Sequence, residues 1–223
     1  MSQVLEYSSN VGMVYVGKKL EKDALLSYIR NFGFGLATGI DLEEESSPQL
    51  RPQKEWTPID LGTVSFGQGI AVTPLQMVRA VAALANGGWL MEPKMVKEVS
   101  DAKGRTIPIA PKKVRRVIDS TSASIITEMM VAAVDRGEAK WAKPPGYRIA
   151  GKTGTAQIPV AGHYDATKTI ASFVGFAPAD NPKFVMLVTL REPKSSPWGS
   201  ETAAPLFFAI AKDLFTYYNL SPQ

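Results

Sequence analysis

The most informative run in this sequence is GYRIAGKTGTAQIP, which occupies residues 146–159. Its first eight residues satisfy G-x-x-x-x-G-K-[ST], the pattern of a phosphate-binding loop. Such a loop follows an apolar strand and opens a helix, so that amides at the helix N-terminus face the phosphates. Here two prolines precede the run, and β-forming residues follow it up to Pro159. We therefore predict a strand from Ile149 to Ile158 that carries Lys152, and we keep a P-loop NTPase only as a third interpretation.

The segments on either side of this run predict an α+β fold. Two more strands are expected at 170–177 and 184–190, and the short loop 178–182 between them favours an antiparallel hairpin. Residues 94–118 also show β character with turns, whereas 41–61 lack periodicity and are expected to form a loop. Helical spacing of apolar residues predicts helices at 9–32 with a break near Leu20, from Thr73 to Gly87, at 120–136 and at 203–218. Because consecutive strands follow helices without β-α-β alternation, a doubly wound parallel sheet is not expected.

Composition excludes several classes of protein. The 223 residues include no cysteine and one histidine, His163, so a disulfide scaffold, a thiolate zinc site and a histidine-based triad are not expected. The histidine is expected in an exposed loop. The net charge of +4 is small, and the basic cluster at 112–116 is interleaved with valine, which indicates a strand edge and not a nucleic-acid arm. No apolar run reaches the ~18 residues of a membrane helix, and the first residues do not resemble a signal peptide.

Two short motifs stand far apart in the chain. Ser8-Ser9-Asn10 is an S-x-N motif at an expected helix start, and Lys152-Thr153-Gly154-Thr155 is a K-T-G-T motif on the predicted strand. In this order they resemble the second and third motifs of the serine acyltransferases that bind penicillin. The longer runs 65–69, 73–77, 148–157 and 171–178 are similar to segments of class B penicillin-binding proteins. Because the similarity is collinear over nearly the whole chain, residues 1–223 are identified as one partial transpeptidase domain.

The resemblance implies a penicillin-binding fold, an antiparallel sheet flanked by helices, and acyl transfer on peptidoglycan stem peptides. Ser8 would take part in the proton relay, and Asn10 would orient the nucleophile's lysine and hold a substrate amide. Lys152 would place positive charge beside the hydroxyls and the substrate carboxylate. Thr153 and Thr155 would bind that carboxylate, the Thr155 amide would donate to the oxyanion, and Gly154 would leave room for the substrate. No cofactor and no metal are implied.

The family's first motif, Ser-x-x-Lys, is expected a few dozen residues before S-x-N. The one match in this sequence is Ser100-Asp101-Ala102-Lys103, which follows S-x-N and has the character of a hairpin turn. We therefore expect no nucleophile in this chain, an N-terminally incomplete domain, and doubtful activity for these 223 residues alone.

The partners that the resemblance implies are stem peptides ending in D-Ala-D-Ala, β-lactams and the cell-wall synthesis machinery, with no nucleic acid. It places the family at the extracytoplasmic face of the cytoplasmic membrane, here through an anchor outside this sequence. The alternative to the enzyme is a fragment that binds stem peptides or partners without chemistry. We also expect an open sheet edge at 184–190, and therefore marginal stability or self-association.

Overall fold

The computed structural model describes residues 1–160 and 163–222. Its centre is an antiparallel sheet of three strands, β5 (Ala150–Val160), β6 (His163–Ala177) and β7 (Phe184–Arg191), in the order β5-β6-β7. The register pairs Thr153 with Phe173 and Phe173 with Val188. The prediction of three consecutive strands is confirmed. His163, expected in a loop, is the first residue of β6, because β6 pairs with β5 beyond the bulge that follows Gln157.

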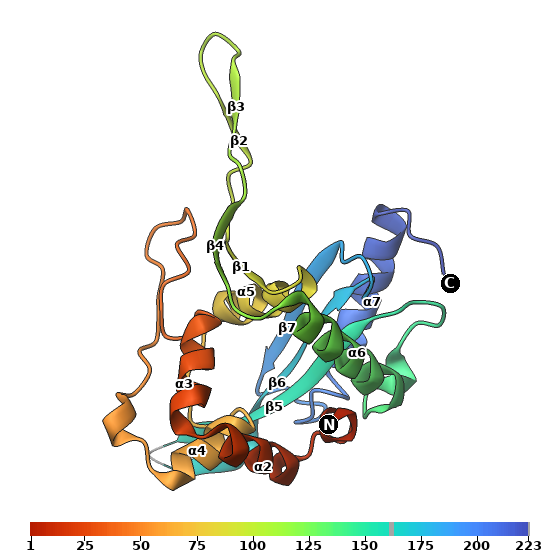
Figure 1. Ribbon diagram of the computed structural model, residues 1–223. Coiled ribbons are helices and arrows are strands. Elements are labelled where there is room, and N and C mark those ends of the chain that lie inside the picture. Colours follow the sequence, from red (N-terminus) through yellow and green to blue (C-terminus); the bar gives the residue numbers. More distant parts are fainter. Residues whose placement is uncertain (161–162, 223) are drawn as a thin grey trace.

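Helices cover both faces of this sheet (Figure 1). Helix α7 (Ala203–Tyr217) packs on one face, where Phe173 of β6 contacts a cluster of buried aromatic rings. Helices α5 (Pro74–Ala85) and α6 (Ser120–Arg136) pack on the other face, where Phe176 is fully buried. Strand alternation directs residues 173 and 176 to opposite faces, so the apolar run along β6 is buried on both sides. The α+β architecture expected from the sequence is confirmed.

The helix starts follow from capping side chains. The Thr73 hydroxyl accepts a hydrogen bond from the amide of Gln76 at 3.1 Å, and the Gln76 side chain accepts one from the Thr73 amide. This capping box begins α5 where the sequence predicts it. Helix α6 is capped by Asp119, one residue before the expected start at Ser120.

The N-terminal part forms four short helices. They are α1 (Ser2–Glu6), α2 (Asn10–Leu20), α3 (Lys22–Asn31) and α4 (Pro58–Ser65), with short 3₁₀ turns at Gln53–Glu55 and, farther along, at Lys140–Ala142. The break near Leu20 is confirmed. The prediction of a loop over the whole of 41–61 is wrong at its end, because Thr57 and Asp60 form a second capping box and Pro58 occupies the first helical position.

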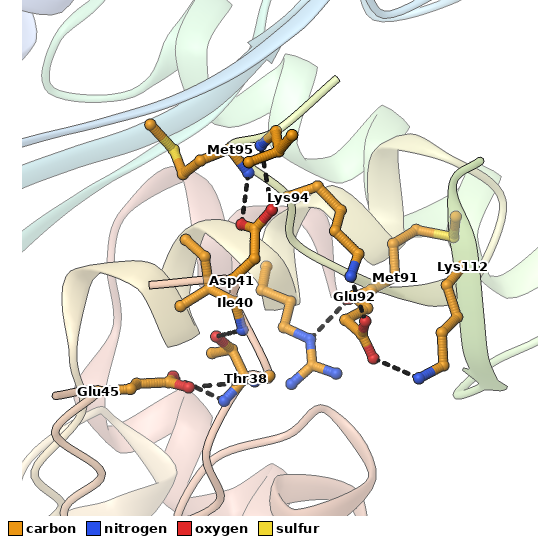
Figure 2. A network of polar contacts seen from close by, with 12 residues as sticks. Thr38, Ile40, Asp41, Glu45, Met91, Glu92, Lys94, Met95 and Lys112 are labelled. Atoms are coloured by element: carbon orange, nitrogen blue, oxygen red, sulfur yellow. Dashed lines mark hydrogen bonds and ion pairs between the residues drawn. The ribbon is translucent and has the colours of Figure 1, made fainter. Parts of the chain in front are cut away.

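A long two-stranded arm projects from the body (Figure 1). Its base pairs β1 (Trp89–Glu92) with β4 (Lys112–Arg116), and its outer part pairs β2 (Glu98–Ser100) with β3 (Thr106–Pro108). Figure 2 shows the polar network at its base, where the Asp41 carboxylate accepts hydrogen bonds from the amides of Met95 and Val96 at 2.7 and 3.1 Å.

Among the helices of the part of the chain described, none is long and apolar enough to span a membrane.

The carboxylate of Glu92 makes the arm base acid-sensitive. Hydrogen bonds from Lys112 and Lys94, at 2.7 and 2.8 Å, lower the pKa of Glu92 from 4.5 to about 2. Because the folded pKa lies below the unfolded one, this contribution to stability is present above pH 4.5 and is lost as the pH falls toward 2. We expect Glu92→Gln to flatten the acid limb of unfolding, measured by circular dichroism. Glu98→Gln is the control, because Glu98 forms no ion pair within the described ranges, and an equal change in both variants would contradict the assignment.

Strand β7 is an edge strand in the described part of the sheet. Its central residues, Val185 to Val188, are apolar and only partly covered, apart from Val188. Since an unpaired apolar edge is a template for pairing between chains, we expect the isolated 223-residue chain to self-associate. Sedimentation velocity tests this, and Leu187→Lys should lower the apparent mass. A monodisperse monomer with a cooperative melt would contradict the expectation.

Candidate active site

Ser8 sits at a strained turn that ends helix α1. The amide of Ser9 donates to the carbonyl of Val4 at 2.9 Å and the amide of Ser8 donates to that of Leu5 at 3.2 Å, which is the Schellman pattern. This motif places Ser8 in the left-handed region, with φ of 49°. Glycine is the usual residue there, and a residue with a side chain costs about 1 kcal/mol or more. The backbone conformation at position 8 therefore favours glycine, and the chain nevertheless places a serine hydroxyl there.

Lys152, in the first half of β5, reaches this turn. Its ammonium Nζ donates to Ser8 Oγ at 2.9 Å and to the carbonyl and hydroxyl of Thr153, both at 3.2 Å. Ser8 and Lys152 are 144 residues apart in the sequence, so the fold joins the two motifs. Burial lowers the pKa of Lys152 below its ordinary value of 10.5, and the carboxylate of Glu138 opposes that shift. The result is a partly desolvated cation next to two hydroxyl groups.

Asn10, the last residue of the S-x-N motif, has no hydrogen bond with Lys152 in the part of the chain described. Asn10 is the first residue of α2, and Ser9 caps that helix by accepting from the amide of Gly12 at 3.1 Å. Asn10 is exposed. In the residues described, the hydrogen bonds of Lys152 go to Ser8 and Thr153 and none goes to Asn10. The role expected for Asn10 toward the nucleophile's lysine stays a prediction.

The two threonines of the K-T-G-T motif share one face of β5, because strand side chains alternate. Thr153 accepts from Lys152, as described above, and Thr155 Oγ1 accepts from the amide of Gly199 at 3.1 Å. A hydroxyl that accepts through its oxygen still has its proton to donate. Both hydroxyls are therefore able to donate to an anion placed over this face.

Gly154 and Gly199 lie where the chain is closely packed. A Cβ at Gly154 would lie 2.5 Å from the Ser172 hydroxyl, and a Cβ at Gly199 would lie 2.4 Å from the Gly154 carbonyl oxygen. The loop that carries Gly199 thus lies directly against β5 and β6. In contrast, the outer edge of β5 carries no strand in the part of the sheet described, so an extended chain has an open edge to pair with.

Ser100, the serine of the one Ser-x-x-Lys match, lies far from Lys152. It is exposed in β2, in the outer part of the arm (Figure 1). Its hydroxyl lies 3.0 Å from that of Thr106. The P-loop interpretation fails on local structure. Residues 150–160 form strand β5, so Lys152 lies inside a strand and no helix begins after Thr153.

Sequence reasoning did not single out three residues that surround this site. Glu6 is buried, with 7% of its surface exposed, and its carboxylate accepts from Arg136 Nε and Nη2 at 3.2 and 2.6 Å. Hydrogen bonding from this guanidinium lowers the pKa of Glu6. Glu138 acts on Lys152 through its charge. No motif marks these residues, because their partners are remote in the sequence.

Comparison with known proteins shows which family this chain is similar to. The profile described as penicillin binding protein transpeptidase domain matches residues 1–213. Stage V sporulation protein D of Bacillus subtilis is 39% identical over 227 residues, which covers 99% of this chain and 35% of that protein. Penicillin-binding protein PbpB of Mycobacterium tuberculosis is 34% identical and is covered to 34% of its length. The chain thus spans about a third of the length of these relatives.

Solved structures show the same fold. Penicillin-binding protein 3 of Mycobacterium tuberculosis, crystallised with ampicillin, superposes with a TM-score of 0.92 at 31% identity, over 100% of this chain and 52% of that one. The transpeptidase domain of penicillin-binding protein 3 from Burkholderia pseudomallei gives a TM-score of 0.87 at 33% identity, with 65% of that chain covered. The fold class inferred from the motifs is therefore confirmed.

Proposed function

Because this chain belongs to the penicillin-binding protein transpeptidase domain family, we propose that it is the part of a peptidoglycan D,D-transpeptidase that holds the substrate carboxylate and the proton relay. The observation that carries this proposal is the 2.9 Å bond from Lys152 to Ser8, which unites motifs 144 residues apart. A partly desolvated cation between two hydroxyls is suited to moving a proton and to binding a carboxylate.

The proposed reaction is acyl transfer through a serine ester. A serine N-terminal to Ser8 attacks the carbonyl carbon of the penultimate D-Ala, a C–O bond forms and the peptide C–N bond breaks. The terminal D-Ala leaves as an amine and carries away the serine's proton, which passes through the lysine of the nucleophile motif and Ser8. An amine of a second stem peptide then attacks the ester carbonyl carbon, an amide C–N bond forms and the ester C–O bond breaks, and the proton lost by the amine returns to the serine oxygen. With a β-lactam the ring opens, no fragment leaves, and the ester persists.

The substrate's terminal carboxylate would lie over the threonine face of β5. Thr153 and Thr155 would donate hydrogen bonds to it, and the charge of Lys152 would attract it. The peptide would extend along the free edge of β5 as an added strand. We further propose that the parent polypeptide works at the outer face of the cytoplasmic membrane, together with the other proteins of cell-wall synthesis. This proposal rests on the relatives of the chain, which include penicillin-binding proteins.

Two measurements on the native polypeptide test the proposal. Intact mass from cells gives its length, and incubation with a penicillin followed by peptide mass spectrometry locates any ester. We expect a covalent adduct on a serine of a Ser-x-x-Lys segment N-terminal to Ser8. A product without any adduct at saturating penicillin would contradict the catalytic proposal. It would favour the second candidate, a binding fragment, because the one Ser-x-x-Lys of the 223 residues lies on the arm. That candidate predicts binding that dialysis reverses.

A further inference from the structure

The position of Ser8 depends on what holds helix α1. This helix has five residues, and a helix this short is not stable by itself in water. Ser8 and Ser9 follow it in the turn described above, so any displacement of α1 moves the Ser8 hydroxyl relative to Lys152. The packing of α1 is therefore part of the geometry of the site.

The C-terminus of α6 provides this packing. The Arg136 guanidinium donates two hydrogen bonds to the two carboxylate oxygens of Glu6, the last residue of α1. The residue after Arg136, Gly137, allows the backbone at the end of α6 to approach the backbone of α1. A Cβ at Gly137 would lie 2.9 Å from the Glu6 carbonyl oxygen and 2.2 Å from that of Ala133. Figure 1 shows the N-terminus lying beside the end of α6.

We infer that the Glu6–Arg136 ion pair is a positioning device that places the Ser8 hydroxyl within hydrogen-bond reach of Lys152. This inference rests on the proposed function and assigns the pair a part in it. A bidentate pair fixes orientation as well as distance, because two parallel N–H···O bonds define the relative angle of the partners. The Arg136 side chain is 63% exposed, whereas that of Glu6 is only 7% exposed. Removing one partner alone would leave a buried charge without its counter-ion, so the test removes both charges together.

The test compares two variants that each remove one ion pair at the end of α6 and keep the net charge. Glu6→Gln with Arg136→Gln removes the pair on α1, and Asp135→Asn with Lys143→Gln removes the neighbouring Asp135–Lys143 pair, which does not involve α1. In the native polypeptide, we expect the first variant to lower the rate of penicillin acylation by roughly 10- to 100-fold, as for a misplaced catalytic group. We expect the second variant to leave this rate unchanged.

A mutant cycle with Ser8→Ala separates positioning from general destabilisation. If the pair acts through Ser8, its removal in the Ser8→Ala background has almost no further effect on acylation, whereas independent effects multiply. A second measurement follows the titration of Lys152 by NMR, with Ser8, Thr153 and Glu138 as the groups that face it. Loosening α1 admits water, so the pKa of Lys152 should move up toward its ordinary value.

The outcomes distinguish the two proposals. If the wild-type polypeptide takes no penicillin label, the proposed function fails, and the Lys152 titration still tests the positioning. Equal Lys152 titration curves in the wild type and in the Glu6–Arg136 variant overturn the inference. So does an acylation rate that falls equally in the control variant.

Discussion

Lys152→Ala is expected to lower the rate of penicillin acylation of the native polypeptide by roughly 10²- to 10⁴-fold, the range of a lost acid–base group. The ammonium of Lys152 donates to Ser8 and Thr153, and alanine leaves both hydroxyls without this donor and the site without its cation. Lys152→Arg should not restore the rate, because a planar guanidinium is larger and cannot replace the compact ammonium between two hydroxyls. Labelling with a fluorescent penicillin over time measures the rate.

Lys183→Ala is the matched control for this prediction. Lys183 is exposed in the loop between β6 and β7 and forms no ion pair among residues 1–160 and 163–222. Circular dichroism should show the same fold for both alanine variants. Undiminished labelling of Lys152→Ala would remove Lys152 from the proposed mechanism.

The pH profile offers an independent test of the same residue. The charged form of Lys152 is the hydrogen-bond donor, so acylation should fall as the pH rises through its pKa, which burial places below 10.5. Because the Glu138 carboxylate raises this pKa, Glu138→Gln should move the alkaline limb to lower pH. A limb that stays in place would show that Glu138 does not act on Lys152.

The sequence was sufficient for the sheet and for the two motifs, because both depend on local patterns. Alternation and apolar runs predict β5, β6 and β7, and the capping pattern at Thr73 predicts the start of α5. The start of helix α4 at Pro58, within the expected loop, was missed. Its capping box has aspartate in place of the usual glutamate or glutamine, and no apolar periodicity marks the helix. The extension of β6 back to His163 follows from pairing with β5, which is a tertiary contact.

The same distinction applies to the site. The resemblance of the two motifs to those of a known family predicts that Ser8 and Lys152 lie together, yet no sequence pattern marks the residues that align them. The Glu6–Arg136 pair joins residues 130 apart, and neither residue belongs to a motif. Likewise, a serine in a left-handed turn is visible only in the backbone. The contact between the two motifs was thus predictable, and the ion pair that packs α1 against α6 was not.

Phe207→Ala is expected to destabilise the fold by about 3–5 kcal/mol, the usual cost of removing a buried aromatic ring. Phe207 of α7 is fully buried, and its ring centroid lies 4.5 Å from that of Phe173 and 5.7 Å from that of Phe208. Alanine leaves a cavity, because β6 is held by pairing with both β5 and β7 and cannot shift alone to fill the space. The free energy of unfolding of a domain of this size is about 5–15 kcal/mol in total. The variant should therefore lose a large part of its stability.

The neighbouring Leu206→Ala provides the control, because Leu206 lies on the same helix with 43% of its surface exposed. Urea unfolding followed by circular dichroism should give a change within about 1 kcal/mol for this variant. The consequence for the site is specific. Phe173 pairs across the ladder with Thr153, so the two side chains lie on the same face of the sheet, and loss of the aromatic cluster removes packing beside the threonines of β5. Penicillin acylation of Phe207→Ala should therefore decline below its melting range, and unchanged acylation there would show that β5 keeps its geometry without α7.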